Sequence, residues 1–209
     1  MLDKKNFYID GKWIPIKDEN TYSKINPSTG KYLGIFPESD KAVVHEAYLS
    51  ARKAFSSWKS MSRFVRSDLM YRVSKIIEER REELATAISL ETGKNYNESI
   101  AEVNEALHMA QFAFSSGRYS HGEAVSSEVQ EKDSYMLRKP KGVIAIVSPF
   151  NFPLAIGAYW CAAPALVEGN TVILKPSEDA PISTQLAVQI YEEAGIPSGV
   201  INLVHGKGE

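Results

Sequence analysis

Apolar residues recur along this chain with two different periods, and the periods predict where helices and strands lie. Between residues 39 and 58 apolar side chains recur every three or four positions, which predicts an amphipathic helix with Ser39 as its N-cap. The same spacing predicts a second helix from about Ser62 to Gly93 and a third that ends at Gly117. All three apolar stripes are expected to pack into a hydrophobic core.

The pattern changes after Gly142, where short, continuous apolar runs rich in β-branched residues alternate with helical segments. One helix is expected from Pro153 to Val167, kinked or shortened by Pro164, and another from Pro181 to Gly195. The first strand has no polar alternation and is expected to be buried on both faces. The order β-α-β-α-β predicts an α/β fold with a parallel sheet and right-handed crossovers. The three strands are expected at 143–147, 171–174 and 200–204.

Turn-forming residues dominate two other parts of the chain. Asp10-Gly11 lies between Phe7–Ile9 and Trp13-Ile14, which predicts a short hairpin near the N-terminus. Residues 118–140 are polar, and a loop followed by one extended, solvent-facing strand is expected there.

Composition and charge limit the classes of function. The 209 residues are 44% hydrophobic and 24% charged, as in an ordinary globular protein, and their net charge of -2 provides no basic face for nucleic acid or an anionic membrane. A single cysteine cannot form an intramolecular disulfide, and no signal peptide or membrane span is expected, so a cytoplasmic location is predicted. The four histidines show no metal-ligand spacing, and no metal site is expected.

Candidate chemistry lies directly after the three strands of the parallel sheet, where such sheets bind ligands. Taken singly, Asn151 could be a helix cap, Lys175 a solvated strand end, and Gly206 and Gly208 a plain turn. Together, these groups can hold a nucleotide: Lys175 and Glu178 could bind ribose hydroxyls, and Gly208 would allow close approach of the backbone. The usual Gly-x-Gly-x-x-Gly dinucleotide fingerprint is absent.

Three motifs at these strand ends, with a fourth upstream, resemble the aldehyde dehydrogenase superfamily in order and spacing. The resemblance extends from about Phe7 to the last residue. The motifs are Ser148-Pro149-Phe150-Asn151-Phe152-Pro153-Leu154, Gly169 to Glu178, Ala194 to Asn202, and upstream Glu91-Thr92-Gly93-Lys94.

The resemblance implies an oxidoreductase that uses NAD, with NADP as an open alternative, to oxidise a small-molecule aldehyde to a carboxylic acid. Asn151 resembles the asparagine that donates a hydrogen bond to the developing oxyanion. A carboxylate at Glu178 favours NAD because it would repel a 2'-phosphate, whereas Lys175 would attract that phosphate. The remaining cofactor contacts implied are Ser148, Pro149 and Phe150 beside the nicotinamide half, Lys175, Ser177 and Glu178 at the adenosine ribose, and Gly208 near the adenine.

The same resemblance implies how the chain is organised. Residues 1–117 are expected to form a hairpin and helices that pack on the cofactor domain, and 118–140 an oligomerisation-type β segment. Residues 141–209 are expected to form the first, incomplete part of an NAD(P)-binding Rossmann-like domain. A homo-oligomer is expected of the intact protein. The stretches after Asn151 and Lys175 are similar to the pyrroline-5-carboxylate dehydrogenase branch.

Members of this family are more than twice as long, and their nucleophilic cysteine and general-base glutamate match positions beyond residue 209. The 209 residues alone are therefore expected to be inactive, and their sheet to have an unsatisfied edge. Cys161 does not match the nucleophile and is expected to be a buried structural thiol. The alternative interpretation is a non-catalytic binding or interaction module.

Overall fold

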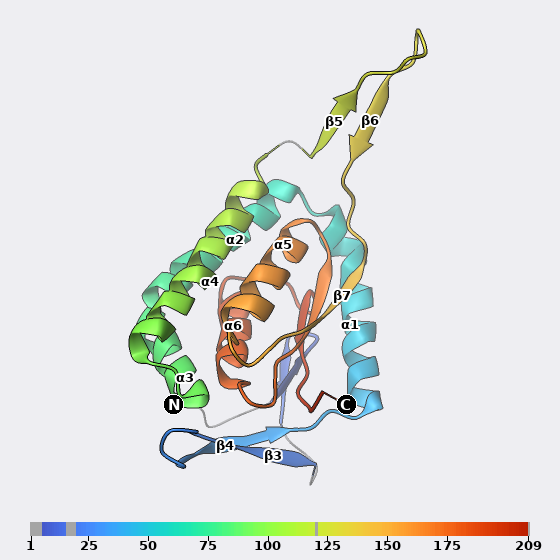
Figure 1. The fold of residues 1–209 in the computed structure, drawn as a ribbon. Helices are drawn as coiled ribbons and strands as arrows, with labels where there is room; N and C mark the ends of the chain where they lie inside the picture. Colours follow the sequence, from blue (N-terminus) through green and yellow to red (C-terminus); the bar gives the residue numbers. More distant parts are fainter. Residues whose placement is uncertain (1–5, 16–19, 120, 209) are drawn as a thin grey trace.

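A five-stranded sheet lies at the centre of the computed structural model, which describes residues 6–15, 20–119 and 121–208 (Figure 1). Its strand order is β2-β1-β9-β8-β7, with the last three strands parallel. The α/β fold and the parallel β-α-β-α-β unit predicted from the sequence are therefore confirmed. The strands are β1 (Phe7–Ile9), β2 (Lys12–Ile14), β7 (Val143–Val147), β8 (Thr171–Lys175) and β9 (Ile201–Leu203).

The prediction that the first parallel strand is buried on both faces is wrong. Ala145 and Val147 of β7 are exposed, Val147 to 71% of its surface, whereas β8 is buried along most of its length. The difference arises because β7 is the outermost strand and has a sheet neighbour on one side only.

The N-terminal hairpin is part of this sheet, which its local sequence does not predict. β1 and β2 pair as the predicted antiparallel hairpin, and Tyr8 of β1 also pairs with Leu203 of β9. β1 therefore covers the side of β9 that β8 leaves open. Within this five-stranded sheet, the open edges among the described residues are those of β2 and β7.

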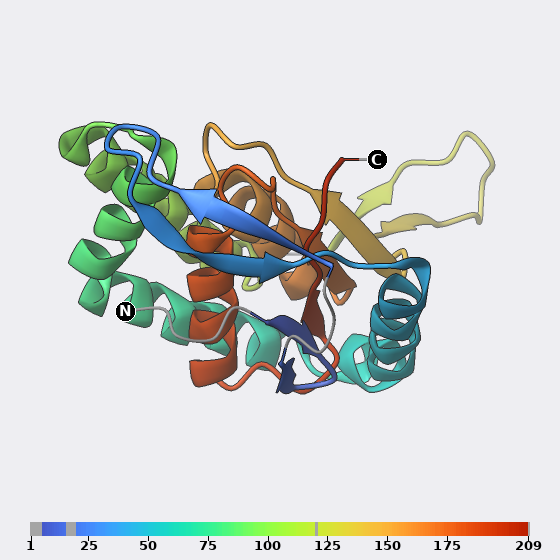
Figure 2. The same ribbon diagram turned by 90° about the horizontal axis from the view of Figure 1, so that it is seen from below.

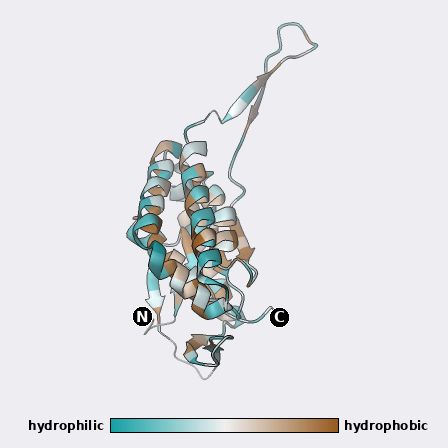
Figure 3. Ribbon diagram, turned by 60° about the vertical axis from the view of Figure 1, so that its left-hand side comes forward, coloured by the Kyte–Doolittle hydropathy of each residue, from teal (hydrophilic) through white to brown (hydrophobic). Residues whose placement is uncertain are grey.

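Helices cover both faces of the sheet. Thr171 and Ile173 of β8 face helix α1, where Thr171 Oγ1 donates to the Ala51 carbonyl, and Val172 and Leu174 face the larger helical layer. Hydrophilic and hydrophobic residues alternate along the outer helices, as expected for amphipathic elements (Figure 3). Among the described residues, no helix is apolar over a length that could cross a membrane. The helices are α1 (Lys41–Ser60), α2 (Arg63–Glu79), α3 (Arg81–Thr92), α4 (Tyr96–Ser116), the π-helix η1 (Ala155–Cys161), α5 (Ala162–Val167) and α6 (Ile182–Glu193).

The helix predicted from Ser62 to Gly93 is two helices that meet at Arg80. No glycine or proline marks this break; the Arg80 side chain donates to Glu83 at 2.7 Å and lies 3.6 Å from Glu193 of α6. Gly93 ends α3 in the left-handed conformation, as predicted. At the start of α1, the capping side chain is Asp40 and not Ser39.

The single helix predicted from Pro153 to Val167 is replaced by η1 followed by α5. Because proline has no N–H, Pro164 in the middle of one long α-helix would remove a hydrogen bond. The Ala162 N–H donates to the Gly157 carbonyl of η1, so α5 continues directly from the π-helix, and Pro164 is the third residue of α5.

Two antiparallel ribbons flank the central sheet. β3 (Thr21–Ile25) pairs with β4 (Tyr32–Pro37), and β5 (Gly122–Val125) pairs with β6 (Ser134–Leu137). The single strand predicted within residues 118–140 is therefore two strands, which project from the body of the molecule (Figure 1, Figure 2). A polar sequence pairs here because each strand supplies the other's backbone hydrogen bonds.

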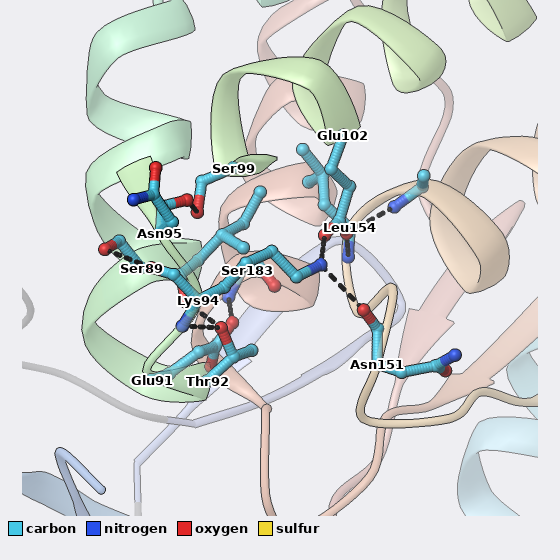
Figure 4. Close-up of polar contacts among 12 residues, drawn as sticks. Ser89, Glu91, Thr92, Lys94, Asn95, Ser99, Glu102, Asn151, Leu154 and Ser183 are labelled. Atoms are coloured by element: carbon cyan, nitrogen blue, oxygen red, sulfur yellow. Dashed lines mark hydrogen bonds and ion pairs between the residues drawn. The ribbon is translucent and has the colours of Figure 1, made fainter. Parts of the chain in front are cut away.

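Glu91 of α3 contacts the start of α6 through a buried carboxyl group. Its two oxygens accept from the backbone N–H groups of Ile182 at 2.6 Å and Ser183 at 3.0 Å (Figure 4). These are the first N–H groups of α6, which is preceded by Pro181 and has no side-chain cap of its own. Burial raises the pKa of Glu91 to about 7, against the opposing effect of these hydrogen bonds.

We expect Glu91→Gln to change how stability depends on pH. The folded protein holds a proton on Glu91 up to a pKa of about 7, whereas the ordinary value is 4.5. The contribution of this proton to stability is complete below pH 4.5 and is lost as the pH rises through 7. As the pH rises from 4.5 to 7, the free energy of unfolding of the wild type should therefore fall relative to that of Glu91→Gln, by up to about 1.4 kcal/mol per pH unit.

Urea unfolding of both proteins over this pH range measures the effect. The control is Glu79→Gln, at an exposed carboxylate at the end of α2. A difference between the wild type and Glu91→Gln that stays constant with pH would contradict the expectation.

Candidate functional site

The carboxyl ends of β7, β8 and β9 meet at one edge of the sheet, as the sequence predicts. The Ser148 N–H, directly after β7, donates to the Lys175 carbonyl at 3.0 Å, and the Val204 N–H, after β9, donates to the Leu174 carbonyl at 2.9 Å. The chain segments that follow the strands therefore begin side by side.

A cavity of about 900 Å³ lies at this edge, between the sheet and the start of α1. We call it the sheet-edge cavity. Lys175, Gly206 and Gly208 line it, and the apolar side chains of Val143, Ala145, Ile173 and Val204 contribute to its wall. The structure therefore brings Lys175 and Gly208 together, as expected of the two predicted cofactor contacts. Ser177 and Glu178 do not line this cavity.

The ammonium group of Lys175 is held by main-chain oxygens. It donates to the carbonyls of Pro176 at 2.9 Å and Gly206 at 2.7 Å, and it lies 3.9 Å from the Glu178 carboxylate. An ammonium group has three protons, so one remains for Glu178 or for a ligand. Burial lowers the pKa of Lys175, and Glu178 partly opposes this change. Ser177 Oγ accepts from the Asp179 N–H and supports the turn after β8.

His205 is a further side chain of the sheet-edge cavity. It is buried between the rings of Phe7 and Phe36, and burial lowers its pKa to about 3, so its imidazole is neutral at physiological pH. Its carbonyl accepts from the Ser39 N–H at 2.8 Å, which fixes the start of α1 against the end of β9.

The three residues predicted beside the nicotinamide half do not line the sheet-edge cavity. Ser148 is buried against Gly157 of η1, where an added Cβ would lie 2.5 Å from the Ser148 Cβ. A glycine is therefore required at 157 for η1 to approach this turn. Pro149 and Phe150 are exposed, Phe150 to 61% of its surface.

A second cavity, of about 950 Å³, lies between α4 and η1, and Asn151 is one of its lining residues. We call it the α4 cavity. Its wall is mainly apolar, with a few charged groups on the α4 side. The lining residues are Lys94, Glu98, Ala101, Glu102, Glu105, Asn151, Phe152, Ala155, Ile156, Trp160 and Cys161.

The turn that carries Asn151 is held by a buried ion pair. Glu102 Oε1 accepts from the N–H groups of Leu154 at 2.9 Å and Ala155 at 3.2 Å, and its Oε2 lies 2.6 Å from Lys94 Nζ (Figure 4). Lys94 Nζ also donates to the main-chain carbonyl of Asn151 at 2.7 Å. The pair thus fixes the main chain on both sides of the turn.

This arrangement leaves the Asn151 side chain free for a ligand. Figure 4 shows its amide pointing away from Lys94, and it has no hydrogen-bond partner among the residues that the structure describes. The interpretation of Asn151 as a simple helix cap is wrong, because Glu102 already accepts the N–H groups at the start of η1. Its amide is therefore free to donate to a ligand.

Sequence reasoning missed most of the α4 cavity. Glu98, Glu102 and Glu105 are spaced by four and three residues, a helical spacing that places them on one face of α4 and could have indicated a polar lining. The prediction of a buried Cys161 is wrong: the residue is exposed and lines this cavity. The wider π-turns of η1 rotate it away from the core face that α-helical spacing would give it.

The chain is similar to known proteins over almost its whole length. The aldehyde dehydrogenase family matches residues 13–209. Malonate-semialdehyde dehydrogenase 1 of Geobacillus kaustophilus is 38% identical over 202 residues, which are 97% of this chain and 41% of the relative. Betaine aldehyde dehydrogenase of Bacillus subtilis is 36% identical over 206 residues, 98% of this chain and 42% of the relative.

A solved structure supports the same assignment. Betaine aldehyde dehydrogenase of Staphylococcus aureus, crystallised with NAD+, superposes with a TM-score of 0.91 at 32% identity, over 98% of this chain and 41% of that one. The chain thus spans about two fifths of the length of the relatives that it matches. The similarity to the pyrroline-5-carboxylate branch is not supported, because these relatives have other substrates in their names.

We expect Glu102→Gln to loosen the turn that carries Asn151. A glutamine could still accept the Leu154 and Ala155 N–H groups, but its NH₂ would face the Lys94 ammonium, donor against donor. The free energy of unfolding should fall by about 2 kcal/mol, as for the loss of a buried charged hydrogen bond. Lys94→Met should have an effect of similar size.

The double variant Lys94→Met/Glu102→Gln tests whether the two groups act as a pair. Urea unfolding should show that it loses clearly less than the sum of the single variants. Additive losses would show that Lys94 and Glu102 stabilise the protein independently.

Proposed function

This chain belongs to the aldehyde dehydrogenase family, and on that basis we propose that it provides the NAD-binding edge and an oxyanion donor for oxidation of an aldehyde to a carboxylic acid. The observation that carries the proposal is the free side-chain amide of Asn151 at the α4 cavity, on a turn that Glu102 and Lys94 hold in place.

The proposed role of Asn151 is electrostatic. When a nucleophile adds to an aldehyde, the carbonyl oxygen becomes negatively charged, and a fixed N–H donor stabilises that charge more than it stabilises the neutral substrate. The turn is already rigid, so the donor needs no reorganisation during the reaction. Lys94 supports this role because it binds the main-chain carbonyl of Asn151 and leaves the side-chain amide without a partner.

The sheet-edge cavity fits the adenosine half of a dinucleotide. The apolar side chains of Ile173 and Val204 offer a flat wall for a purine, and Lys175 retains one proton for a ribose hydroxyl. When bound, NAD would supply the hydride acceptor. Glu178, next to Lys175, favours NAD over NADP because its carboxylate would repel a 2'-phosphate.

The nucleophilic cysteine and general-base glutamate of the family do not match any residue of this sequence. We therefore propose that the 209 residues by themselves bind the cofactor but do not turn over aldehydes. Cys161 faces the α4 cavity, so Cys161→Ser tests whether it substitutes for the nucleophile. Aldehyde-dependent NADH formation by the 209-residue chain, abolished in Cys161→Ser, would contradict this part of the proposal.

The β5–β6 ribbon is proposed as the contact with a second copy of the chain. It projects from the body, and Tyr135 and Leu137 of β6 are exposed to 70% and 65% of their surfaces (Figure 1). Each outer edge of a two-stranded ribbon has unpaired backbone groups that another strand can bind.

We expect Asn151→Ala to lower kcat about a hundredfold, with little change in KM, in the complete gene product assayed with NAD and an aldehyde. The matched control is Asn97→Ala, because Asn97 is exposed at the start of α4 and does not line the α4 cavity. Unchanged kcat in Asn151→Ala would remove the proposed oxyanion role.

Cofactor binding can be tested on the 209-residue chain by calorimetric titration with NAD and NADP. Lys175→Met should weaken binding of NAD about tenfold, because it removes a charged hydrogen-bond donor. Glu178→Gln should improve binding of NADP relative to NAD, since one negative charge near the ribose is lost. If Glu178→Gln leaves this ratio unchanged, the carboxylate does not select the cofactor.

A further inference from the structure

The hydrogen bonds at the end of the π-helix η1 pass over one carbonyl group. The Ala162 N–H donates to the carbonyls of Gly157 and Tyr159. In an α-helix its partner would be the carbonyl of Ala158, four residues earlier. The Ala158 carbonyl instead accepts from the Tyr191 hydroxyl of α6 at 2.5 Å. Tyr191 thus occupies the acceptor that an α-helical η1 would use.

This contact lies in the core, where an unpaired polar group is costly. Tyr191 and Ala158 are both fully buried. Burial raises the pKa of Tyr191 well above its ordinary value, so the hydroxyl keeps the proton that it donates. A buried carbonyl that loses its donor destabilises a protein unless it finds another one. Without the hydroxyl, the Ala158 carbonyl can regain a donor by taking the Ala162 N–H, which requires the α-helical register.

A second side chain of α6 holds the chain just before η1. Thr184 Oγ1 donates to the Pro153 carbonyl at 2.8 Å, in a buried position. Thr184 and Tyr191 are seven residues apart and therefore share one face of α6. Pro153 comes two residues after Asn151, so α6 fixes the main chain between the turn that carries Asn151 and the end of the π-helix.

The register of η1 decides which side chains turn away from the core. Counted from the buried Leu154, Ala158 and Cys161 are at i+4 and i+7, which an α-helix would place on the same buried face. Ala158 is buried, but Cys161 is exposed. Each π-helical hydrogen bond spans one residue more than an α-helical one. An α-helical η1 would therefore turn Cys161 toward the core and release a residue into the segment next to Asn151, because α5 continues from the other end.

We propose that the Tyr191 hydroxyl holds η1 in the π-helical register and thereby positions the turn that carries Asn151. Tyr191 is a positioning residue, because it lines neither the sheet-edge cavity nor the α4 cavity and acts through the main chain of η1. Thr184 assists at the start of the same segment. The effect on catalysis rests on the proposed oxyanion role of Asn151, whereas the effect on η1 does not.

The thiol of Cys161 reports on the register, because it is the single cysteine of the 209 residues. Tyr191→Phe removes the hydroxyl and keeps the ring. Under native conditions, labelling of Cys161 with the disulfide reagent DTNB should be at least about threefold slower in Tyr191→Phe than in the wild type, and slower again in Thr184→Val/Tyr191→Phe. A mere loss of stability would have the opposite effect, since unfolding exposes the thiol further.

Tyr159→Phe is the matched control for this measurement. The Tyr159 ring is buried and stacks on Tyr191 with 5.5 Å between ring centres, but its hydroxyl has no hydrogen-bond partner among the residues that the structure describes. Its loss should leave the labelling rate of Cys161 unchanged. A wild-type rate in Tyr191→Phe, or an equal decrease in Tyr159→Phe, would overturn the proposal.

Kinetics of the complete gene product, assayed with NAD and an aldehyde, test the effect on Asn151. Tyr191→Phe should lower kcat about tenfold with little change in KM, because it misplaces a group that acts in the transition state. In an Asn151→Ala background the same change should have no further effect on kcat, and a full further loss would overturn the positioning role. If Asn151→Ala alone leaves kcat unchanged, the oxyanion role fails, and the labelling of Cys161 still decides the register of η1.

Discussion

Burying a carboxyl group costs free energy unless it is hydrogen-bonded, and two buried carboxyl groups tie α4 and α3 to the helices that follow strands β7 and β8. Glu102 accepts the N–H groups that begin η1, and Glu91 accepts those that begin α6. Each contact satisfies both partners, because the first N–H groups of a helix have no acceptor within the helix and a buried carboxyl group needs hydrogen-bond donors. The position of Asn151 follows from the first of these contacts, since Lys94 and Glu102 together fix the turn on which it lies.

Local sequence patterns predicted the elements whose boundaries are set locally. The alternation of strands and helices after Gly142 was sufficient for the parallel sheet, and Gly93 marked a helix end because only glycine adopts its conformation easily. The break at Arg80 was not predictable in the same way, because no glycine or proline marks it and the Arg80 side chain contacts Gln189 and Glu193 of α6, more than a hundred residues later. The pairing of β1 with β9 also depends on distant residues and leaves no local pattern.

For the candidate sites, the sequence indicated the strand ends at which a ligand would bind. It did not indicate which residues of other elements line the rest of each cavity. Lys175 and Gly208 meet at one cavity because parallel strands end at a common edge, a rule that needs no coordinates. The α4 cavity has a wall from a helix more than forty residues earlier, and only the packing of α4 on η1 brings Glu105 and Trp160 to the same cavity. Cys161 was misplaced for a similar reason, because a π-helix changes which side chains share a face, and apolar sequence does not distinguish π from α.

The pairing of β1 with β9 also has a consequence for synthesis on the ribosome. The hydrogen bond from the Asp10 N–H to Asn202 Oδ1 joins groups 192 residues apart, so β1 leaves the ribosome long before β9, its second neighbour in the sheet. At translation rates of roughly 5–20 residues per second, β1 waits on the order of 10 to 40 s with the aromatic side chains of Phe7 and Tyr8 unprotected. Slowing translation or truncating the message therefore prolongs a state in which these side chains are available to chaperones or to aggregation.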